Sequence, residues 1–498
     1  MNVNPITRLD YPDPDVIRVE DTYYMVSTTM HFMPGCEILQ SFDLVHWEHV
    51  TYVYETLDHT DAQQLKSGQN IYGQGMWAAS LRYHEGRFYI CFVANDTRKT
   101  YLYTSEKIDG PWKKQLIEGF YHDGSLLFDE DGRNYIVYGN DEIWITELNE
   151  DLTAPKKDGL HRLLVSDHKN PELGYEGSHI QKINGYYYIF LIHSLRDRWM
   201  RTEACFYSDS LEGEFTGGDV LCDDRGYCGQ GVAQGGIVDT PDGKWYAMLF
   251  QDSGAVGRIP ILLPVTWKDH FPFFGQNGHV PEEIEVHSTR PGYIYQPLVG
   301  SDDFCNGLLP RWQFNHDPDP RYYHLDALQG TYTITTREVC TELTQAVNTL
   351  TQRMSYPSCA AEVTVDASAL KEGDVAGLCA LQSCYAAVGI TKHHGKYEVL
   401  MLDKKEDGIL DMTERTVVES HQMDFRLEAD FCNMKDEARC YYRVNKGDWL
   451  PIGTVHKLYF KLDHFTGCRF GLFCYAAEET GGSACFRDFK YYDVDEIS

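Results

Sequence analysis

Three carboxylates occupy matching places in a repeated pattern of this chain. Asp13, Asp123 and Glu176 each stand at or just before the start of a short run of β-branched and aromatic residues, which a turn joins to a second such run. Trp77 and Gln234 hold the same place in two further copies. Glycoside hydrolysis suits such a group, because it needs one carboxylic acid to protonate the leaving oxygen and a second carboxylate as base or nucleophile.

The repeat itself predicts the elements that bring these residues together. Copies of the hairpin begin near residues 13, 77, 123, 176 and 234. An all-strand repeat of roughly 40–50 residues is typical of a β-propeller blade. Because one hairpin cannot bury both of its faces, the five sheets must stack around a common axis. We therefore expect a five-bladed β-propeller with the five heading residues at one mouth of its channel.

A purely structural explanation has to be weighed for each acid. A single Asp or Glu before a strand is often a turn residue. Three acids at equivalent places are harder to explain in this way, since their mutual repulsion costs free energy and raises at least one pKa. We interpret Asp13, Asp123 and Glu176 as catalytic, and Asp15 as a turn residue or a solvent-facing neighbour.

The chain is long enough for two domains. We expect the propeller over residues 1–290, a linker rich in Pro and Gly over 291–301, and a second domain over 302–498. Eight or more short alternating strands in that last part predict a jelly-roll β-sandwich. Residues 54–75 form a polar connection that is either a lid beside the site or an insertion in a blade.

Composition limits the classes of partner. Lys and Arg number 44 against 75 Asp and Glu, and the net charge of −31 argues against nucleic acid and anionic membranes and for a neutral or cationic ligand. The first ten residues lack a signal-peptide pattern and no apolar run is long enough to span a membrane, so we expect a cytoplasmic location. The 15 cysteines are scattered without metal-ligand spacing, which predicts free buried thiols and no metal site.

At its motifs the chain resembles glycoside hydrolase family 43. The matching residues, in the order of the family, are Asn4-Pro-Ile with Tyr11-Pro-Asp-Pro14, Trp77-Ala, His122-Asp-Gly-Ser125, Tyr175-Glu-Gly177 and Gly257-Arg258. The C-terminal part resembles the concanavalin-like sandwich appended to the β-xylosidase branch. The resemblance implies a five-bladed propeller and inversion of anomeric configuration. It assigns Asp13 as general base, Asp123 as modulator of the acid's pKa, and Glu176 as general acid.

The resemblance also implies residues that contact substrate. Arg258 matches an arginine that contacts sugar hydroxyls, with a surface ion pair as the alternative. Trp77 matches a residue lining the subsite of the non-reducing sugar, and blade packing is an equally good explanation. Phe465 resembles a sandwich aromatic that caps the pocket, although core packing is the usual role of a lone Phe.

Three positions depart from the family pattern. Gln234 stands where members often carry a histidine that is sometimes linked through water to calcium, which puts a channel metal in doubt. Met30 and Phe32 replace a phenylalanine and a tryptophan in the expected pocket wall, so the choice between xylose and arabinofuranose stays open. Catalysis requires no cofactor. A structural calcium in the sandwich at Asp302 or Asp488 is an open alternative, although lone acidic residues are more often solvated.

Together these observations predict an exo-acting, inverting glycoside hydrolase. It would release terminal pentose from xylo- or arabino-oligosaccharides. The leading hypothesis is a β-xylosidase, and the alternative is an α-L-arabinofuranosidase or a bifunctional enzyme. The rival from another class is a non-catalytic sugar-binding protein, in which the three acids would be free to be amides. The sequence is also compatible with a homo-oligomer.

Overall fold

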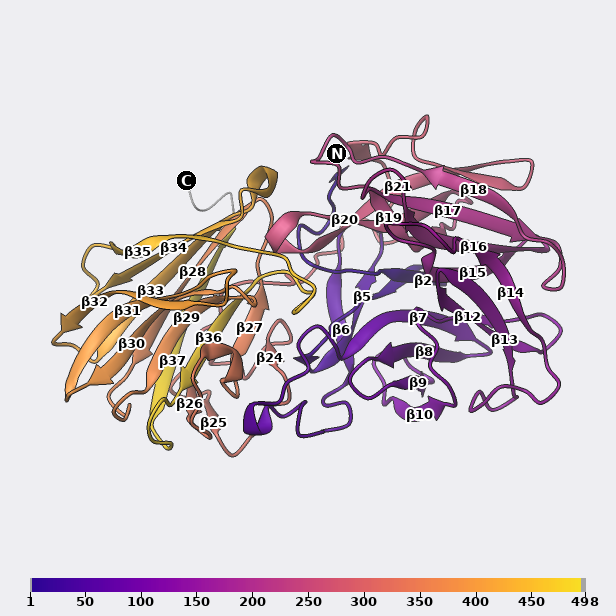
Figure 1. The fold of residues 1–498 in the computed structure, drawn as a ribbon. Helices are drawn as coiled ribbons and strands as arrows, with labels where there is room; N and C mark the ends of the chain where they lie inside the picture. The colour runs from indigo at the N-terminus through magenta and orange to yellow at the C-terminus, as the bar shows by residue number, and fades with distance from the viewer. Residues whose placement is uncertain (1, 494–498) are drawn as a thin grey trace.

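The computed structural model describes residues 2–493 and is built almost wholly of β-strands. Figure 1 shows two β domains side by side, the first running from indigo to magenta and the second from orange to yellow. Five four-stranded sheets make up the first domain, and an eight-stranded and a seven-stranded sheet make up the second. The predicted fold class, a five-bladed propeller followed by a β-sandwich, is confirmed.

Each blade is one antiparallel sheet whose strands follow the chain from the axis outward. The blades are β2 (Asp15–Val19), β3 (Thr22–Val26), β5 (Gly35–Ser41) and β6 (Glu48–Tyr54); β7 (Met76–His84), β8 (Arg87–Ala94), β9 (Lys99–Ser105) and β10 (Lys113–Ile117); β11 (Ser125–Phe128), β12 (Asn134–Asn140), β13 (Glu142–Leu148) and β14 (His161–Ser166); β15 (Glu176–Ile183), β16 (Tyr186–Ser194), β17 (Arg201–Ser208) and β18 (Thr216–Leu221); β19 (Val232–Asp239), β20 (Trp245–Asp252), β21 (Arg258–Lys268) and β22 (Phe271–Phe274).

The first strands of the five blades form a closed ring. β2 contacts β7, β7 contacts β11, β11 contacts β15, β15 contacts β19, and β19 contacts β2 again. A separate apolar cluster fills each gap between neighbouring blades. This packing supplies the burial that a single hairpin lacks, so residues heading the first strands meet at one end of the axis.

The N-terminus ties the last blade to the first. β1 (Asn2–Val3) pairs with β23 (Glu283–Ile284), which follows the fifth blade. The buried side-chain amide of Asn4 donates to the carbonyl of Leu262 at 2.8 Å and accepts from its N–H at 3.0 Å. The Asn4-Pro-Ile motif therefore has a structural role, because it fixes the N-terminus to the fifth blade and so helps to close the ring.

The sandwich sheets enclose one large apolar core. The eight-stranded sheet runs β32 (Leu410–Val418), β31 (Lys396–Lys404), β30 (Ala386–His393), β29 (Val375–Leu381), β36 (Arg469–Tyr475), β27 (Leu350–Arg353), β24 (Gln313–Asn315) and β4 (Phe32–Met33). The seven-stranded sheet runs β25 (Tyr323–Asp326), β26 (Thr331–Thr335), β37 (Ser483–Asp493), β28 (Ser358–Asp366), β33 (Gln422–Asp430), β34 (Glu437–Arg443) and β35 (Leu450–Lys457). Short 3₁₀ turns lie at η1 (Lys66–Gly68), η2 (Gly254–Val256), η3 (Leu343–Gln345) and η4 (Cys432–Met434).

The two domains share one sheet, because β4 belongs to a loop of the first blade. Phe32 and Met33 pair antiparallel with Asn315 and Phe314 of β24. The expected linker, residues 291–301, also lies against the first blade. There the backbone N–H of Phe42 donates to the Tyr295 hydroxyl at 2.9 Å.

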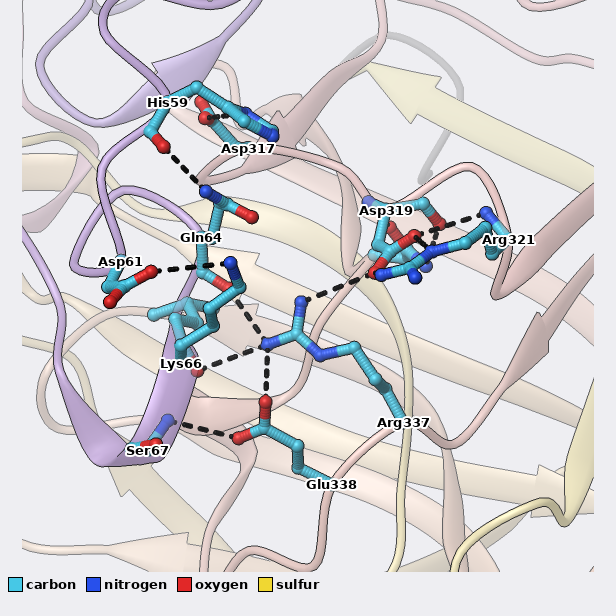
Figure 2. A network of polar contacts seen from close by, with 12 residues as sticks. His59, Asp61, Gln64, Lys66, Ser67, Asp317, Asp319, Arg321, Arg337 and Glu338 are labelled. Atoms are coloured by element: carbon cyan, nitrogen blue, oxygen red, sulfur yellow. Dashed lines mark hydrogen bonds and ion pairs between the residues drawn. The ribbon is translucent and has the colours of Figure 1, made fainter.

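The connection over residues 54–75 lies against the sandwich. Figure 2 shows His59 beside Asp317, with His59 Nδ1 2.8 Å from the carboxylate, and Arg337 of the sandwich donating to the carbonyl of Gln64 at 2.9 Å. Its residues do not appear among the walls of the main cavity. Of the two alternatives, lid or blade insertion, the structure supports an insertion, and this insertion joins the domains.

Two expectations from composition can be compared with the structure. The 15 cysteines all lie within residues 2–493 and all are free, as expected. The expectation that they are buried is wrong for Cys222, Cys228, Cys305 and Cys432, which are exposed. In the same part of the chain, no helix has the length and apolar character needed to cross a lipid bilayer.

Three buried histidines meet where the domains touch. The rings of His31 and His316 lie 4.8 Å apart, and His464 stacks on Tyr72 with ring centroids at 3.9 Å. Burial lowers the pKa of His31 and His316 well below the ordinary value, and it lowers the pKa of His464 to about 4. All three rings are therefore neutral in the folded protein at pH 7.

We expect this cluster to make the protein sensitive to acid. Below about pH 6.5 the histidines of the unfolded chain bind protons, whereas the buried histidines of the folded chain do not. The free energy of unfolding therefore falls, as pH is lowered, by up to about 1.4 kcal/mol per pH unit for each histidine. For His464 the loss continues to about pH 4. His464→Phe keeps an aromatic ring against Tyr72 and should flatten the slope between pH 7 and 5 in urea titrations, whereas the exposed His168→Gln should not. An unchanged slope in His464→Phe would contradict this account.

Candidate active site

The mouth of the propeller channel is a cavity of about 820 Å³ with walls from both domains. Its lining includes all three predicted catalytic acids, Asp13, Asp123 and Glu176. The other residues around it are Trp77, Asn95, Arg98, Phe120, His122, Asn140, Leu173, Trp199, Arg201, Gln230, Gln234, Asp252, Gly254, Arg258, Met434, Phe460, Leu462 and Phe465. Acids far apart in the chain thus share one cavity because each heads a strand on the same axis.

Irregular backbone turns these side chains toward the cavity. Asp13, Asp123 and Gln234 all have positive φ angles (52°, 48° and 60°), which non-glycine residues adopt at a cost. Glu176 begins β15 at a register shift, and Gly177 has a φ of 65°. A Cβ at Gly177 would lie 2.7 Å from the side chain of Gln234, so this position needs glycine. Such bulges re-aim side chains at functional sites.

Asp13 is a buried carboxylate with both oxygens engaged. Oδ1 accepts a hydrogen bond from the Arg258 guanidinium at 3.0 Å, and Oδ2 accepts one from the Thr28 hydroxyl at 2.5 Å. The two donors hold the plane of the carboxylate, and the guanidinium compensates its negative charge. An oriented, charge-compensated carboxylate is suited to accept a proton.

Asp123 and Glu176 form a close acid pair. Asp123 is buried and accepts a hydrogen bond from the N–H of Gly177 at 2.9 Å, while Glu176 accepts one from the Asn140 amide at 2.7 Å. Burial raises the pKa of Asp123 to about 6, with the negative charges of Glu176 and Asp13 adding to the rise and His122 opposing it. Asp123 therefore holds a proton more readily than an isolated carboxylate does.

His122 joins this pair and was not assigned a role from the sequence. Its Nε2 lies 3.5 Å from an oxygen of Asp123 and 3.5 Å from an oxygen of Glu176. Burial alone would lower its pKa, but the charges of Asp123, Glu176 and Asp13 outweigh burial and raise it to about 9. The signal in the sequence was its place directly before Asp123, in the motif His122-Asp-Gly-Ser125.

Arg258 lies at the bottom of the cavity and is almost fully buried, so a surface ion pair is the wrong explanation. Its guanidinium carbon sits 4.3 Å from the centre of the Phe465 ring. Among residues 2–493, nothing accepts a hydrogen bond from its Nε or Nη2. These buried donors are available to the hydroxyls of a bound sugar.

Asp10 positions this arginine and was not recognised from the sequence. Its carboxylate accepts from the N–H of Arg258 at 2.7 Å and from the N–H of Gly467 at 2.8 Å. A Cβ at Gly257 would lie 2.3 Å from Asp10, which explains the glycine before Arg258. One carboxylate therefore links the blade that carries Arg258 to the sandwich loop that carries Phe465.

Phe465 closes one side of the cavity. Its ring centroid lies 5.5 Å from that of Trp77, and both side chains are half-buried and line the cavity. Met434, Phe460 and other sandwich residues extend the same wall. The second domain is therefore part of the pocket, and Phe465 is not a residue of the sandwich core.

Met30 and Phe32 were predicted in the pocket wall, and this prediction is wrong. Met30 is buried in a backbone bridge to Met76. Phe32 lies 3.4 Å under the Arg469 guanidinium and belongs to a second apolar cluster of the sandwich, separate from the core between its sheets. The loop turns away from the axis because β4 pairs with β24 of the sandwich.

The interpretation of Asp15 as a turn or solvent-facing residue is also wrong. Its side chain is buried, with Oδ2 at 2.8 Å from Arg82 and Oδ1 at 3.1 Å from His179. Arg82 reaches on to the Ser125 hydroxyl and the Ile180 carbonyl, so its guanidinium joins the first strands of four blades. The channel below the site therefore contains a cation from the protein itself.

The alternative of a structural calcium in the sandwich stays open. Asp302 and Asp488 line one surface depression. The carboxylate of Asp302 accepts hydrogen bonds from the N–H of Phe304 and from the indole of Trp312, each at 2.8 Å.

Glu203 is a buried acid behind the cavity wall. One oxygen accepts the N–H of Gln234 at 2.7 Å, and the other has no hydrogen-bond partner within the described residues. Burial raises the pKa of Glu203 well above its ordinary value, so the folded protein keeps this carboxyl protonated.

We expect Glu203→Gln to stabilise the protein increasingly as pH rises. Above about pH 4.3 the unfolded chain releases the Glu203 proton and the folded chain keeps it, so wild-type stability falls by up to about 1.4 kcal/mol per pH unit, a loss that glutamine avoids. Urea unfolding at pH 6, 7 and 8 should show the gap widening. The exposed Glu212→Gln is the matched control, and a gap independent of pH would contradict the prediction.

A five-bladed propeller with three acids and a buried arginine around one sugar-sized pocket defines a glycoside hydrolase. Comparison with known families gives the assignment: this chain belongs to glycoside hydrolase family 43. The model of Glycosyl hydrolases family 43 matches residues 3–272, and that of the Beta xylosidase C-terminal Concanavalin A-like domain matches residues 301–492. The family expected from the motifs is confirmed.

Individual relatives are similar over most or nearly all of the chain. A β-xylosidase of Formosa agariphila is 27% identical over 99% of this chain and 89% of its own. A non-reducing end α-L-arabinofuranosidase of Bacteroides ovatus is 24% identical over 82% and 79%. The solved structure of a bifunctional GH43-CE protein of Bacteroides eggerthii is 42% identical with a TM-score of 0.92, covering 99% of this chain. This chain spans 63% of the length of that structure.

Proposed function

We propose that this protein is an exo-acting, inverting glycoside hydrolase that releases terminal pentose from xylo-oligosaccharides, that is, a β-xylosidase. The observation that carries the proposal is the shared cavity of Asp13, Asp123 and Glu176 above the unpaired donors of Arg258. The alternative substrate is an α-L-arabinofuranoside, which the relatives named as arabinofuranosidases favour.

The roles follow from the contacts of each acid. Glu176, held by Asn140, donates its proton to the glycosidic oxygen as the bond to the anomeric carbon breaks. Asp13, held by Thr28 and Arg258, takes a proton from the water that attacks the opposite face. Asp123 keeps a proton in the acid pair by like-charge repulsion.

The shape of the pocket supports cleavage at a chain end. Phe465, Phe460 and Leu462 of the sandwich close the side of the propeller mouth that an open groove would leave free. A terminal sugar can then reach Arg258 at the bottom, while the rest of the oligosaccharide leaves through the entrance. The rival reading as a non-catalytic sugar-binding protein gives no reason for three acids in one pocket.

Paired assays test the proposal. Nitrophenol release from aryl β-xyloside and aryl α-L-arabinofuranoside gives the two kcat/KM values, and we expect the xyloside to be preferred. Proton NMR of the first turnovers should show α-xylose appearing from the β-linked substrate. An enzyme that prefers the arabinofuranoside would establish the alternative, and initial β-xylose would contradict inversion. Failure to cleave either glycoside would overturn the proposal.

A further inference from the structure

His122 occupies a place in the pocket that the general acid/base scheme leaves unexplained. Its Nε2 is 3.5 Å from a carboxylate oxygen of Asp123 and 3.5 Å from one of Glu176. One polar side-chain atom from each of the three residues lies within 4.8 Å of the other two. Its ring packs against Trp77 with centroids 5.8 Å apart. Within residues 2–493 this buried nitrogen makes no regular hydrogen bond, so its contacts are with charges.

The groups that face His122 are mostly negative. Asp123 and Glu176 touch it, and Asp13 acts on it from across the cavity. Three carboxylates in one cavity repel one another strongly where water is excluded. Without a compensating charge, the pocket would bind more protons than the reaction can use.

The other cations of the pocket are engaged elsewhere. Arg258 is paired with Asp13 at 3.0 Å, and Arg201 with Asp252 at 2.8 Å. Arg98 lies at the exposed rim, its guanidinium 3.9 Å from the centre of the Phe120 ring. Of the cations that line the cavity, His122 is the one in contact with the acid pair.

We propose that His122 is a positioning residue whose imidazolium charge keeps Asp123 ionised beside a protonated Glu176. This inference rests on the proposed function. With His122 positive, Asp123 negative and Glu176 neutral, the cluster carries no net charge before the reaction. The raised pKa of His122, about 9, agrees with this distribution.

The same charge assists the proton transfer. When Glu176 gives its proton to the glycosidic oxygen, the C–O bond breaks and a second negative charge appears beside Asp123. That charge forms 3.5 Å from the imidazolium, which stabilises it. His122 keeps both of its own protons throughout, and the proton released by the attacking water goes to Asp13.

Two substitutions separate charge from packing. His122→Gln removes the positive charge at similar size, and His122→Lys restores it. For His122→Gln we expect the alkaline limb of the kcat/KM profile to move up by about 1 pH unit, because the acid holds its proton more tightly without a neighbouring cation. Its kcat on xylobiose should fall about 10-fold or more, and less on aryl xylosides with acidic leaving groups. His122→Lys should keep the wild-type limb.

A direct measurement does not depend on activity. In ¹⁵N-labelled wild-type protein, the ring nitrogens of His122, assigned by comparison with His122→Gln, should show an imidazolium at pH 7.5 that titrates above pH 8. A neutral His122 ring at pH 7.5 would overturn the proposal. It would also be overturned if the kcat/KM profile of His122→Gln matched wild type in both limbs and kcat fell equally on xylobiose and on aryl xylosides. Failure of the wild-type enzyme on every pentoside would instead overturn the proposed function and leave the titration result standing.

Discussion

Glu176→Gln should lose nearly all turnover of xylobiose, about 10²- to 10⁴-fold, while turnover of substrates with very acidic aryl leaving groups should be largely spared. The reason is that glutamine cannot protonate the glycosidic oxygen, and a leaving group that is already a stable anion does not need the proton. The carbonyl oxygen of the substituted glutamine can still accept the hydrogen bond from Asn140, so the local packing is kept. Initial rates on xylobiose and on dinitrophenyl and methoxyphenyl xylosides measure the effect.

The control for this variant is Glu172→Gln, an exposed acid on the same connection. It should behave as wild type with every substrate. Equal losses of Glu176→Gln on xylobiose and on the activated aryl xyloside would show that Glu176 is not the acid.

Asp13→Asn should have the second large effect on turnover, and this loss should not depend on the leaving group. A water molecule must be deprotonated whatever the leaving group is, so kcat should fall about 10²- to 10⁴-fold on xylobiose and on activated aryl xylosides alike. The substituted asparagine can still accept from Arg258 or Thr28 through its carbonyl oxygen, but it no longer compensates the charge of the buried Arg258 guanidinium, so the melting temperature should fall.

The exposed Asp109→Asn serves as the matched control for Asp13→Asn. Activity that returns on substrates with better leaving groups would contradict the role of Asp13 as base. The contrast between a leaving-group-dependent loss at Glu176 and an independent loss at Asp13 assigns acid and base in one set of assays.

The local sequence pattern was enough to predict the architecture and the three catalytic acids. Strand alternation, turn residues and the repeated hairpin predicted five blades, because each blade uses the same short-range pairing and the same exposed apolar faces. Asp13, Asp123 and Glu176 could be found in this way because their places in the repeat place them on one axis. Arg258 and Phe465 came from the family resemblance, and both lie in the cavity.

Only the tertiary structure decided where loops and individual polar side chains lie and what they contact. Phe32 leaves the pocket because its backbone pairs with a strand of the other domain, and Asp15, two residues from Asp13, faces Arg82 inside the channel. His122 becomes a cation because two acids from different blades surround its ring. A sequence specifies which residues can pair or carry charge. Their pairing partners and electrostatic fields, however, arise from segments far away in the chain, which meet only when the ring and the sandwich close.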